Sequence, residues 1–539
     1  MVGAGRIGRA TRRRCRSRAG LEASRLGRRL NFSGFDRRPT VNHAALPRVL
    51  IVGGGYTGVC LAVQWVRQAA QPLDITLIEP RAQLGQGMAY STTDPDHRLN
   101  APTYVHTAIP QEAWHFTRWC QAQGLNQTDP QALHADGARY MRRSDFARYL
   151  AQTLEAHAHG AVNGCQITHV QDVAVDAQRT ATGWQLRTRG GQVLQADMLL
   201  LATGNPPLRL PAPFADAWRD HPAVIENGLD TPRLKAIPAD ARVLVLGGGL
   251  TARDALATLL GQGHAGPLVV MSRRGLMPKP QGPVLPVLAQ IDTPGVLDQL
   301  PGRVLMNRLA NPVPEFLQQV GPSPTVRALL RALRQRMAQV SVEGVGWTVP
   351  FDELRDALWQ LWPRLPLAQK RRFFQRLRVW YDVHRFRSVP QTDTAVQQAL
   401  AAGQLQFWAG QVQAAAQATS GPGLRLSLSR KVDGQRQHSA EIFDAVVNCT
   451  GLDTAAGLAE NPLLQSLTAQ GHLRLDDVRM GLAVDAQCCA LNASGQAQAD
   501  LRVVGPATLG TFGDPIGAMF IGGHVARTVP DMLRVLQGA

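Results

Sequence analysis

Two segments of the sequence repeat one pattern: a short apolar run, three consecutive glycines and the start of a helical pattern. The first copy begins at Arg48 and the second at Arg242, 194 positions later. The first glycine permits a tight turn, the second lets backbone N–H groups approach a phosphate, and a third small residue lets the helix pack closely on the strand. The pyrophosphate of a dinucleotide binds at the positive end of such a helix. The repeat therefore predicts two Rossmann-type units and two bound nucleotides.

The two copies differ at the residue that would contact the ribose. In the first copy an apolar strand ends at Glu79, 26 positions after the first glycine of the turn. A carboxylate there accepts hydrogen bonds from both ribose hydroxyls. In the second copy the equivalent residue is Arg273, which lies between Ser272 and Arg274. A hydroxyl and two guanidinium groups suit a 2′-phosphate, which a carboxylate would repel. We expect FAD in the first site and NADPH in the second.

The formal net charge of +17 is concentrated at one end of the chain. Residues 1–45 contain twelve arginines and two acidic residues, which leaves a net charge of +7 for the rest. This tail has no hydrophobic periodicity and is expected to be disordered. The tail offers an alternative role in binding nucleic acid or an anionic surface, but nucleic acid is not an expected partner of the protein.

Several classes of protein are excluded by what the sequence lacks. Seven cysteines are scattered without a CxxC pair, which fits a reducing cytoplasm and excludes the dithiol centre of disulfide reductases. No apolar run reaches the roughly eighteen residues that span a bilayer. The sequence has no zinc-ligand spacing, P-loop or nucleophile elbow, so no metal is expected. With 45% hydrophobic and 18% charged residues, the chain is expected to be a soluble cytoplasmic enzyme.

Turn residues and hydrophobic patterns divide the chain into parts. The apolar run 198–201 ends in a turn at Gly204, and the prolines that follow mark the exit from a domain. Helical periodicity predicts helices over 326–340, 350–362 and 367–384. The fold class is therefore α/β, with two Rossmann-like dinucleotide-binding domains, the FAD domain being discontinuous. The predicted parts are a basic disordered tail (1–46), the first part of the FAD-binding domain (47–210), an NAD(P)-binding domain (211–435) with a helical insert (285–390), and the C-terminal part of the FAD-binding domain (436–539).

Five short motifs accompany this organisation. They are Gly-Gly-Gly-Tyr-Thr-Gly (53–58), Gly-Gln-Gly-Met-Ala-Tyr (85–90), Leu-Asn-Ala-Pro (99–102), Ser-Arg-Arg-Gly (272–275) and Val-Gly-Pro (504–506). Together, over about residues 47–530, they resemble the bacterial FAD-NAD(P)-binding family of flavoproteins, which is related to the N-hydroxylating flavin monooxygenases. The resemblance implies that Asp514, in a terminal Gly-Asp turn, holds the ribityl chain of FAD. It also implies that a helix over 517–529 directs its N-terminus at the pyrimidine end of the flavin.

The residues expected to bind the coenzymes lie in these turns, loops and strand ends. For FAD they are Gly53, Gly55, Thr57, Gly58, Glu79, Gly87, Asn100, Gly204, Gly505 and Asp514. For NADPH they are Gly247, Gly249, Thr251, Ala252, Ser272, Arg273 and Arg274. Two nearby charged residues are given minor roles: Arg143 is interpreted as a solvated helix charge, and Asp254 as a local cap or pairing partner.

One stretch of the insert combines an imidazole with guanidinium groups. His384 could donate a proton to the flavin or the substrate, and Arg385 or Arg387 could hold a carboxylate or the phosphates of NADPH. The alternative interpretation of His384 is a satisfied core histidine, because it shares a helical face with Trp380 and other apolar residues. Both interpretations stay open on the sequence, with His384 and Arg385 as the catalytic candidates.

Flavin and nicotinamide carry the difficult chemistry themselves, so the chain needs no conspicuous catalytic residue. The leading hypothesis is an NADPH-dependent flavoenzyme: hydride passes to FAD, and the reduced flavin uses molecular oxygen to hydroxylate a small-molecule substrate, with nitrogen as a candidate position. One alternative is a reductase that passes electrons to a quinone or a protein acceptor. Another is a non-catalytic redox sensor, whose bound FAD would not be reduced by NADPH.

Overall fold

The computed structural model of the protein describes residues 46–538, except for 136, 162, 207, 216, 283–312, 343–345, 420, 452–457 and 459. The tail predicted for residues 1–46 lies outside the described residues, apart from Leu46, and so does part of the predicted insert. Within the described ranges, no helix is both long and apolar enough to cross a membrane.

The first sheet is built around the first copy of the repeated unit. Its strand order is β15-β16-β7-β1-β2-β3, and all neighbours are parallel except β15 and β16. The central strands β1 and β7 consist almost wholly of buried apolar side chains, as expected of parallel strands covered on both faces. The strands are β1 (Arg48–Val52), β2 (Asp74–Ile78), β3 (Gln166–Val170), β7 (Met198–Leu201), β15 (Cys489–Leu491) and β16 (Ala497–Val503).

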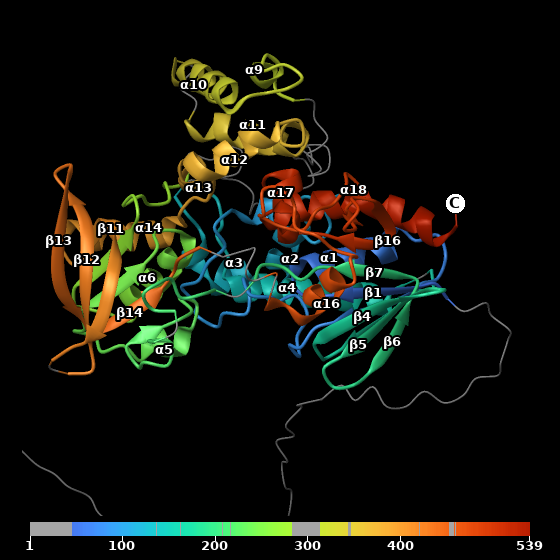
Figure 1. Ribbon diagram of the computed structural model, residues 1–539, viewed down its shortest axis with the longest axis horizontal. Helices are drawn as coiled ribbons and strands as arrows, with labels where there is room; N and C mark the ends of the chain where they lie inside the picture. Colours follow the sequence, from blue (N-terminus) through green and yellow to red (C-terminus); the bar gives the residue numbers. More distant parts are fainter. Residues whose placement is uncertain are drawn as a thin grey trace, which may run out of the picture. The chain divides into compact units, whose positions relative to one another are not determined.

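Helices from distant parts of the chain pack together in the first domain. α1 (Tyr56–Gln68) follows β1 and packs against α4 (Arg143–His159) and the C-terminal helix α18 (Ala518–Leu536). Figure 1 shows α18, in red, beside α1. Because β16 and α18 come from the end of the chain, this domain is discontinuous, as predicted. A small antiparallel sheet, with α16 (Pro462–Ala469) against it, consists of β4 (Ala174–Thr180), β5 (Gly183–Thr188) and β6 (Val193–Ala196).

The second sheet is built around the second copy. Its strand order is β13-β12-β11-β10-β9-β14-β8, parallel from β8 to β11 and antiparallel beyond. The strands are β8 (Val224–Ile225), β9 (Val243–Leu246), β10 (Leu268–Ser272), β11 (Leu405–Gln417), β12 (Leu424–Val432), β13 (Gln435–Phe443) and β14 (Ala445–Asn448). Its helices are α5 (Thr231–Lys235), α6 (Leu250–Gly261) and α14 (Pro390–Ala401), of which α5 and α14 both pack against α6.

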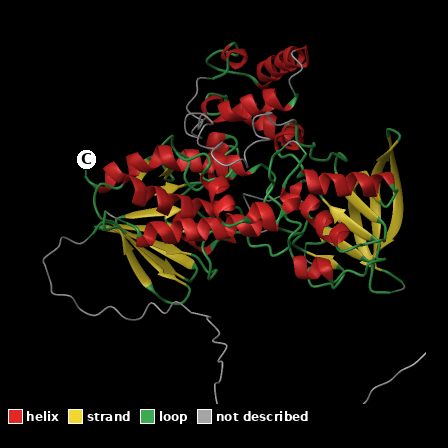
Figure 2. Cartoon of the chain, turned by 180° about the vertical axis from the view of Figure 1, so that it is seen from behind, coloured by secondary structure: helices red, strands yellow, loops and turns green. Residues whose placement is uncertain are grey.

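The second domain extends further along the chain than predicted. Both β13 and β14 lie in the second sheet, so the predicted boundary between residues 435 and 436 is wrong. The error has a simple cause: β14 and β7 are both short buried apolar strands followed by a Thr-Gly turn, and such a pattern does not reveal which parallel sheet a strand joins. The α/β fold class with two Rossmann-like units is confirmed, and Figure 2 shows the helices that accompany the strands.

The described part of the insert is helical. Its helices are α9 (Glu315–Gln318), α10 (Val326–Val342), α11 (Thr348–Leu361), α12 (Leu367–Arg376) and α13 (Arg378–Arg385), which Figure 1 shows gathered without strands. They bury a small apolar core around Leu358 and Trp362. α12 ends at Arg376 and α13 begins at Arg378, with Leu377 between them at φ −119°, so the single helix predicted over 367–384 is two. The remaining short helices are η1 (Thr103–Val105), α2 (His115–Ala122), α3 (Leu125–Thr128), η2 (Pro130–Ala132), η4 (Pro506–Thr508) and α17 (Leu509–Phe512).

Candidate active site

The first glycine turn connects β1 to α1 and leaves no room for side chains. Gly53 has φ +108°, and a Cβ atom there would lie 2.3 Å from the carbonyl oxygen of Ala202. A Cβ atom on Gly58 would lie 1.9 Å from the carbonyl oxygen of Gly53. The close approach of α1 to the strand therefore depends on glycine at both positions, for the reason that the sequence indicated.

Polar groups around this turn suit a bound dinucleotide. Glu79 is only 5% exposed, and its Oε2 accepts a hydrogen bond of 2.9 Å from the N–H of Gly54, so the carboxylate lies directly over the turn. The N-cap residue of α1 is Gly55, which has no side chain to cap the helix, so backbone N–H groups are left for an anion. The hydroxyl of Thr203 is buried and has no hydrogen-bond partner among the described residues. These residues fit FAD.

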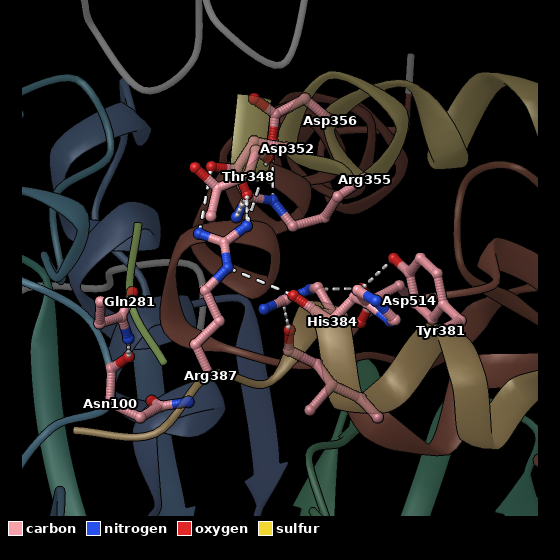
Figure 3. A network of polar contacts seen from close by, with 12 residues as sticks. Asn100, Gln281, Thr348, Asp352, Arg355, Asp356, Tyr381, His384, Arg387 and Asp514 are labelled. Carbon is pink, nitrogen blue, oxygen red and sulfur yellow. Dashed lines mark hydrogen bonds and ion pairs between the residues drawn. The ribbon is translucent and has the colours of Figure 1, made fainter. Parts of the chain in front are cut away.

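Two more FAD candidates, Gly87 and Gly505, approach the same turn. A Cβ atom on Gly55 would lie 3.3 Å from the Cα of Gly87, and one on Gly505 would lie 2.8 Å from the hydroxyl of Thr57. Gly204 has φ +70° and follows β7. Asn100 and Asp514 make other contacts: the carbonyl of Asn100 accepts a hydrogen bond of 2.8 Å from the side chain of Gln281 (Figure 3), and Asp514 contacts the insert.

The second glycine turn opens into a cavity of about 950 Å³. Gly247 has φ +98°, and a Cβ atom there would lie 2.2 Å from the carbonyl oxygen of Cys449. The N-cap residue of α6 is Gly249, which provides no side-chain cap, and Ala252 is buried in the first turn of the helix. The cavity is lined by most of the NADPH candidates, namely Gly247, Gly249, Thr251, Ser272, Arg273 and Arg274. The uncapped helix and the three residues at the end of β10 fit NADPH.

The insert forms another wall of this cavity. Gln375 and Arg376 at the end of α12, and Arg378 and Asp382 on α13, line it together with the coenzyme candidates. The guanidinium of Arg274 lies 5.7 Å from the centre of the Trp380 ring, which places α13 beside the end of β10. The sequence offered Arg385 or Arg387 of the insert as contacts of the NADPH phosphates, but neither residue lines the cavity. The insert residues that do were not predicted, because no local pattern links them to a strand a hundred residues earlier.

Asp514 is bound by two side chains of α13. Its Oδ2 accepts hydrogen bonds from Arg385 Nε at 2.7 Å and from the Tyr381 hydroxyl at 3.0 Å, as Figure 3 shows for the tyrosine. The side chain of Arg385 is 11% exposed and that of Asp514 is 4% exposed. Burial raises the pKa of Tyr381 well above its usual value. This carboxylate thus anchors the insert to the terminal turn. A ribityl contact for Asp514 remains a prediction, and Oδ1 is the oxygen left for it.

The histidine of this stretch has the contacts of a structural residue. His384 Nδ1 lies 2.7 Å from the carbonyl oxygen of Trp380, one helical turn earlier. Its ring stacks on Phe351 with ring centres 4.6 Å apart. Arg387 forms an ion pair with Asp352 of α11, within the insert (Figure 3). These contacts favour the core interpretation of His384. Arg385 donates a hydrogen bond to Asp514 and does not line the cavity.

Replacing Arg385 with alanine is expected to destabilise the protein by about 3 kcal/mol, because it leaves the buried Asp514 carboxylate without its cation. Urea-induced unfolding, followed by tryptophan fluorescence, measures the change. The control is Arg474→Ala, which removes a more exposed ion pair with Asp477 and should cost less than about 1 kcal/mol. Equal unfolding midpoints for the two variants would show that the insert is not anchored at Asp514.

Buried polar contacts also join α6 to the first domain. His97 Nε2 lies 3.0 Å from Thr258 Oγ1 and 3.1 Å from the carbonyl oxygen of Asp254. Arg143 of α4 forms an ion pair with Asp254 at 2.8 Å. The expectations of a solvated Arg143 and of a purely local role for Asp254 are therefore wrong. Because α6 begins at the second glycine turn, these contacts hold that turn against the first domain.

Comparisons with known proteins agree with this architecture. Residues 50–206 match the model of a family described as FAD-NAD(P)-binding, which confirms the resemblance for this segment. No curated protein matches the sequence significantly. A cadaverine monooxygenase of the desferrioxamine biosynthetic pathway from Erwinia amylovora, solved with FAD, is 12% identical with a TM-score of 0.56, over 92% of this chain and 95% of that one. An ornithine N-hydroxylase from Kutzneria sp. 744, whose structure contains reduced FAD, NADP+ and ornithine, is 13% identical with a TM-score of 0.55, over 92% and 99%.

Within the part of the chain that the structure describes, no group of three or more histidine, cysteine, aspartate or glutamate side chains could hold a metal ion. The six cysteines of this part are all buried and free. Burial raises the pKa of Cys60 to about 12, which keeps that thiol protonated and unreactive.

Proposed function

We propose that the protein is a flavin-dependent, NADPH-using monooxygenase that hydroxylates a small amine at nitrogen. One observation carries the proposal. The cavity that begins at Ser272–Arg274 also contacts Pro506 and Ile516 of the first domain, so a coenzyme held in it extends from the candidate phosphate-binding arginines towards the flavin domain. When bound, the two coenzymes supply hydride transfer and the activation of oxygen.

The chain itself supplies binding and orientation. The free N–H groups at the starts of α1 and α6 would hold the two pyrophosphates, and Glu79 would accept hydrogen bonds from the ribose of FAD. Arg273 and Arg274 would hold the 2′-phosphate of NADPH with paired N–H donors. The contacts between α6 and the first domain would hold the two coenzyme sites in a fixed arrangement relative to each other.

The substrate class is inferred from the structural neighbours. Their names give cadaverine and ornithine as substrates, and both are small primary alkylamines. An amine is therefore the first substrate class to test. The arrangement of two nucleotide sites is shared with reductases, so product analysis has to separate the two reactions.

The test uses the purified protein with FAD, NADPH, oxygen and a panel of primary amines. With its substrate, we expect one N-hydroxylated product per NADPH and per oxygen molecule consumed, detected as a mass gain of one oxygen atom. The control reaction omits the amine. Quinone reduction by NADPH without a hydroxylated product from any amine would contradict the proposal and favour the reductase.

A further inference from the structure

One face of α13 is directed at the coenzyme cavity and carries a single acidic side chain. Val379, Asp382 and Val383 of α13, and Phe386 directly after the helix, all line the cavity, at the spacing of one helical face. Asp382 is the one carboxylate among the described residues that do so. Its Oδ2 accepts a hydrogen bond of 3.2 Å from Arg378 Nε, and among the described residues its Oδ1 accepts none. The site of the proposed reaction thus contains one carboxylate, which the coenzyme scheme does not use.

The charge balance of the cavity changes when NADPH binds. Four arginines line it, namely Arg273, Arg274, Arg376 and Arg378, against the one aspartate. NADPH carries a charge of about −4 when its 2′-phosphate is fully ionised. The loaded cavity therefore has a net charge of about −1, which favours a cation as the third component. An alkylamine is such a cation at neutral pH, because its pKa is about 10.

We propose that Asp382 binds the ammonium group of the substrate and accepts its proton. This inference rests on the proposed function and assigns the residue that recognises the amine. Nitrogen must have a free electron pair to be hydroxylated, and an ammonium ion has none. A carboxylate in contact with the ammonium group both holds it and removes the proton, in the manner of a general base.

The proton balance of the reaction agrees with this role. Overall, the ammonium substrate, NADPH and O2 give the hydroxylamine, NADP+ and one water. The N–H bond of the ammonium ion breaks and its proton passes to Asp382. The amine then gains a hydroxyl group in place of a second hydrogen, which leaves as a proton. NADPH is oxidised, oxygen is reduced, and this proton and the one held by Asp382 are both used in the reduction of oxygen to water. No further reductant or acid is required.

The electrostatic surroundings set the pH range in which Asp382 can act. Burial and the nearby Asp514 carboxylate raise its pKa, Arg378 and Arg385 on its own helix lower it, and the result is a pKa of about 6. The other charges that line the cavity are Arg273, Arg274 and Arg376. Below about pH 6 the carboxyl is protonated and cannot accept a proton, so amine hydroxylation should rise as the pH increases through 6.

The direct test compares Asp382→Asn with the wild-type protein, both loaded with FAD and NADP+. Calorimetry measures the binding of cadaverine, and pentane-1,5-diol serves as a neutral probe of similar shape. For the variant we expect at least tenfold weaker binding of cadaverine, with unchanged binding of the diol and of NADP+. The control is Glu353→Gln, which changes a carboxylate of the insert that does not line the cavity. This variant should bind cadaverine, the diol and NADP+ as the wild-type protein does.

The pH profile provides the second test. In turnover, Asp382→Asn should lower kcat/KM for the amine about a hundredfold and abolish the rise near pH 6. Arg378→Gln removes a charge that lowers the pKa of Asp382, so the rise should move to higher pH, a shift that loss of packing would not produce. Equal cadaverine binding by Asp382→Asn, or a parallel loss of NADP+ binding, would overturn the inference while leaving the monooxygenase assignment intact. If the wild-type protein binds and hydroxylates no amine of the panel, the amine part of the proposed function itself is wrong.

Discussion

Replacing Gly58 with valine should abolish the retention of FAD, with binding weakened at least about a hundredfold. A Cβ atom at this position would lie 1.9 Å from the carbonyl oxygen of Gly53, so α1 must move away from the strand. Overpacking of this kind costs about 3 kcal/mol, which corresponds to that loss in affinity. In the proposed site the first glycine turn and the start of α1 would together hold the pyrophosphate, so the displacement would disrupt both.

The flavin content after purification and the titration of apoprotein with FAD measure this effect. Gly451→Ala is the matched control, because a Cβ atom there meets nothing within 4 Å. The control should retain FAD in full. A valine variant that still carries one flavin per chain would show that FAD does not bind at the first turn.

The double change Arg273→Ser and Arg274→Ser is expected to weaken the binding of NADP+ about a hundredfold and to leave the binding of NAD+ nearly unchanged. Each substitution would remove one charge-assisted contact with the 2′-phosphate, and each such contact is worth about 1.5 kcal/mol. The two coenzymes differ only in that phosphate, so the ratio of their affinities isolates the effect. High salt should also reduce the preference of the wild-type protein for NADP+ over NAD+.

Fluorescence or calorimetric titration of the FAD-loaded protein with each nucleotide provides the measurement. Arg372→Ser serves as the control, since it removes an exposed arginine of the insert that does not line the cavity. Equal losses for NADP+ and NAD+ would mean that these arginines do not bind the 2′-phosphate.

The sequence predicted those features that depend on local pattern. Each glycine turn, with its preceding strand and following helix, could be predicted because the steric requirement lies within a dozen residues. The return of the chain to the first domain was also predictable, since β16 ends in a glycine turn before α18. The sequence did not predict which sheet β14 joins, because the apolar sequence of a buried parallel strand does not indicate which strands lie beside it.

The parts of the site that the sequence did not predict depend on contacts between distant segments. Arg143 and Asp254 form a pair across 111 positions, and Arg385 and Asp514 across 129. The indole ring of Trp362 packs on Gly513, where a Cβ atom would lie 2.6 Å from the ring. Nothing in the spacing of these residues indicates their partners. For the same reason Asp382 was not among the site candidates, although its charge was visible in the sequence.

The measurement that tests the central claim most directly is an anaerobic titration of the flavin-loaded protein with NADPH, followed by visible absorbance. The account predicts that one equivalent of NADPH bleaches the flavin, at lower concentration than NADH, because we propose that each glycine turn binds its own coenzyme and that NADPH lies in the cavity that reaches Pro506 and Ile516 of the first domain. A flavin that stays oxidised under saturating NADPH, or a protein that cannot be loaded with flavin, would contradict it.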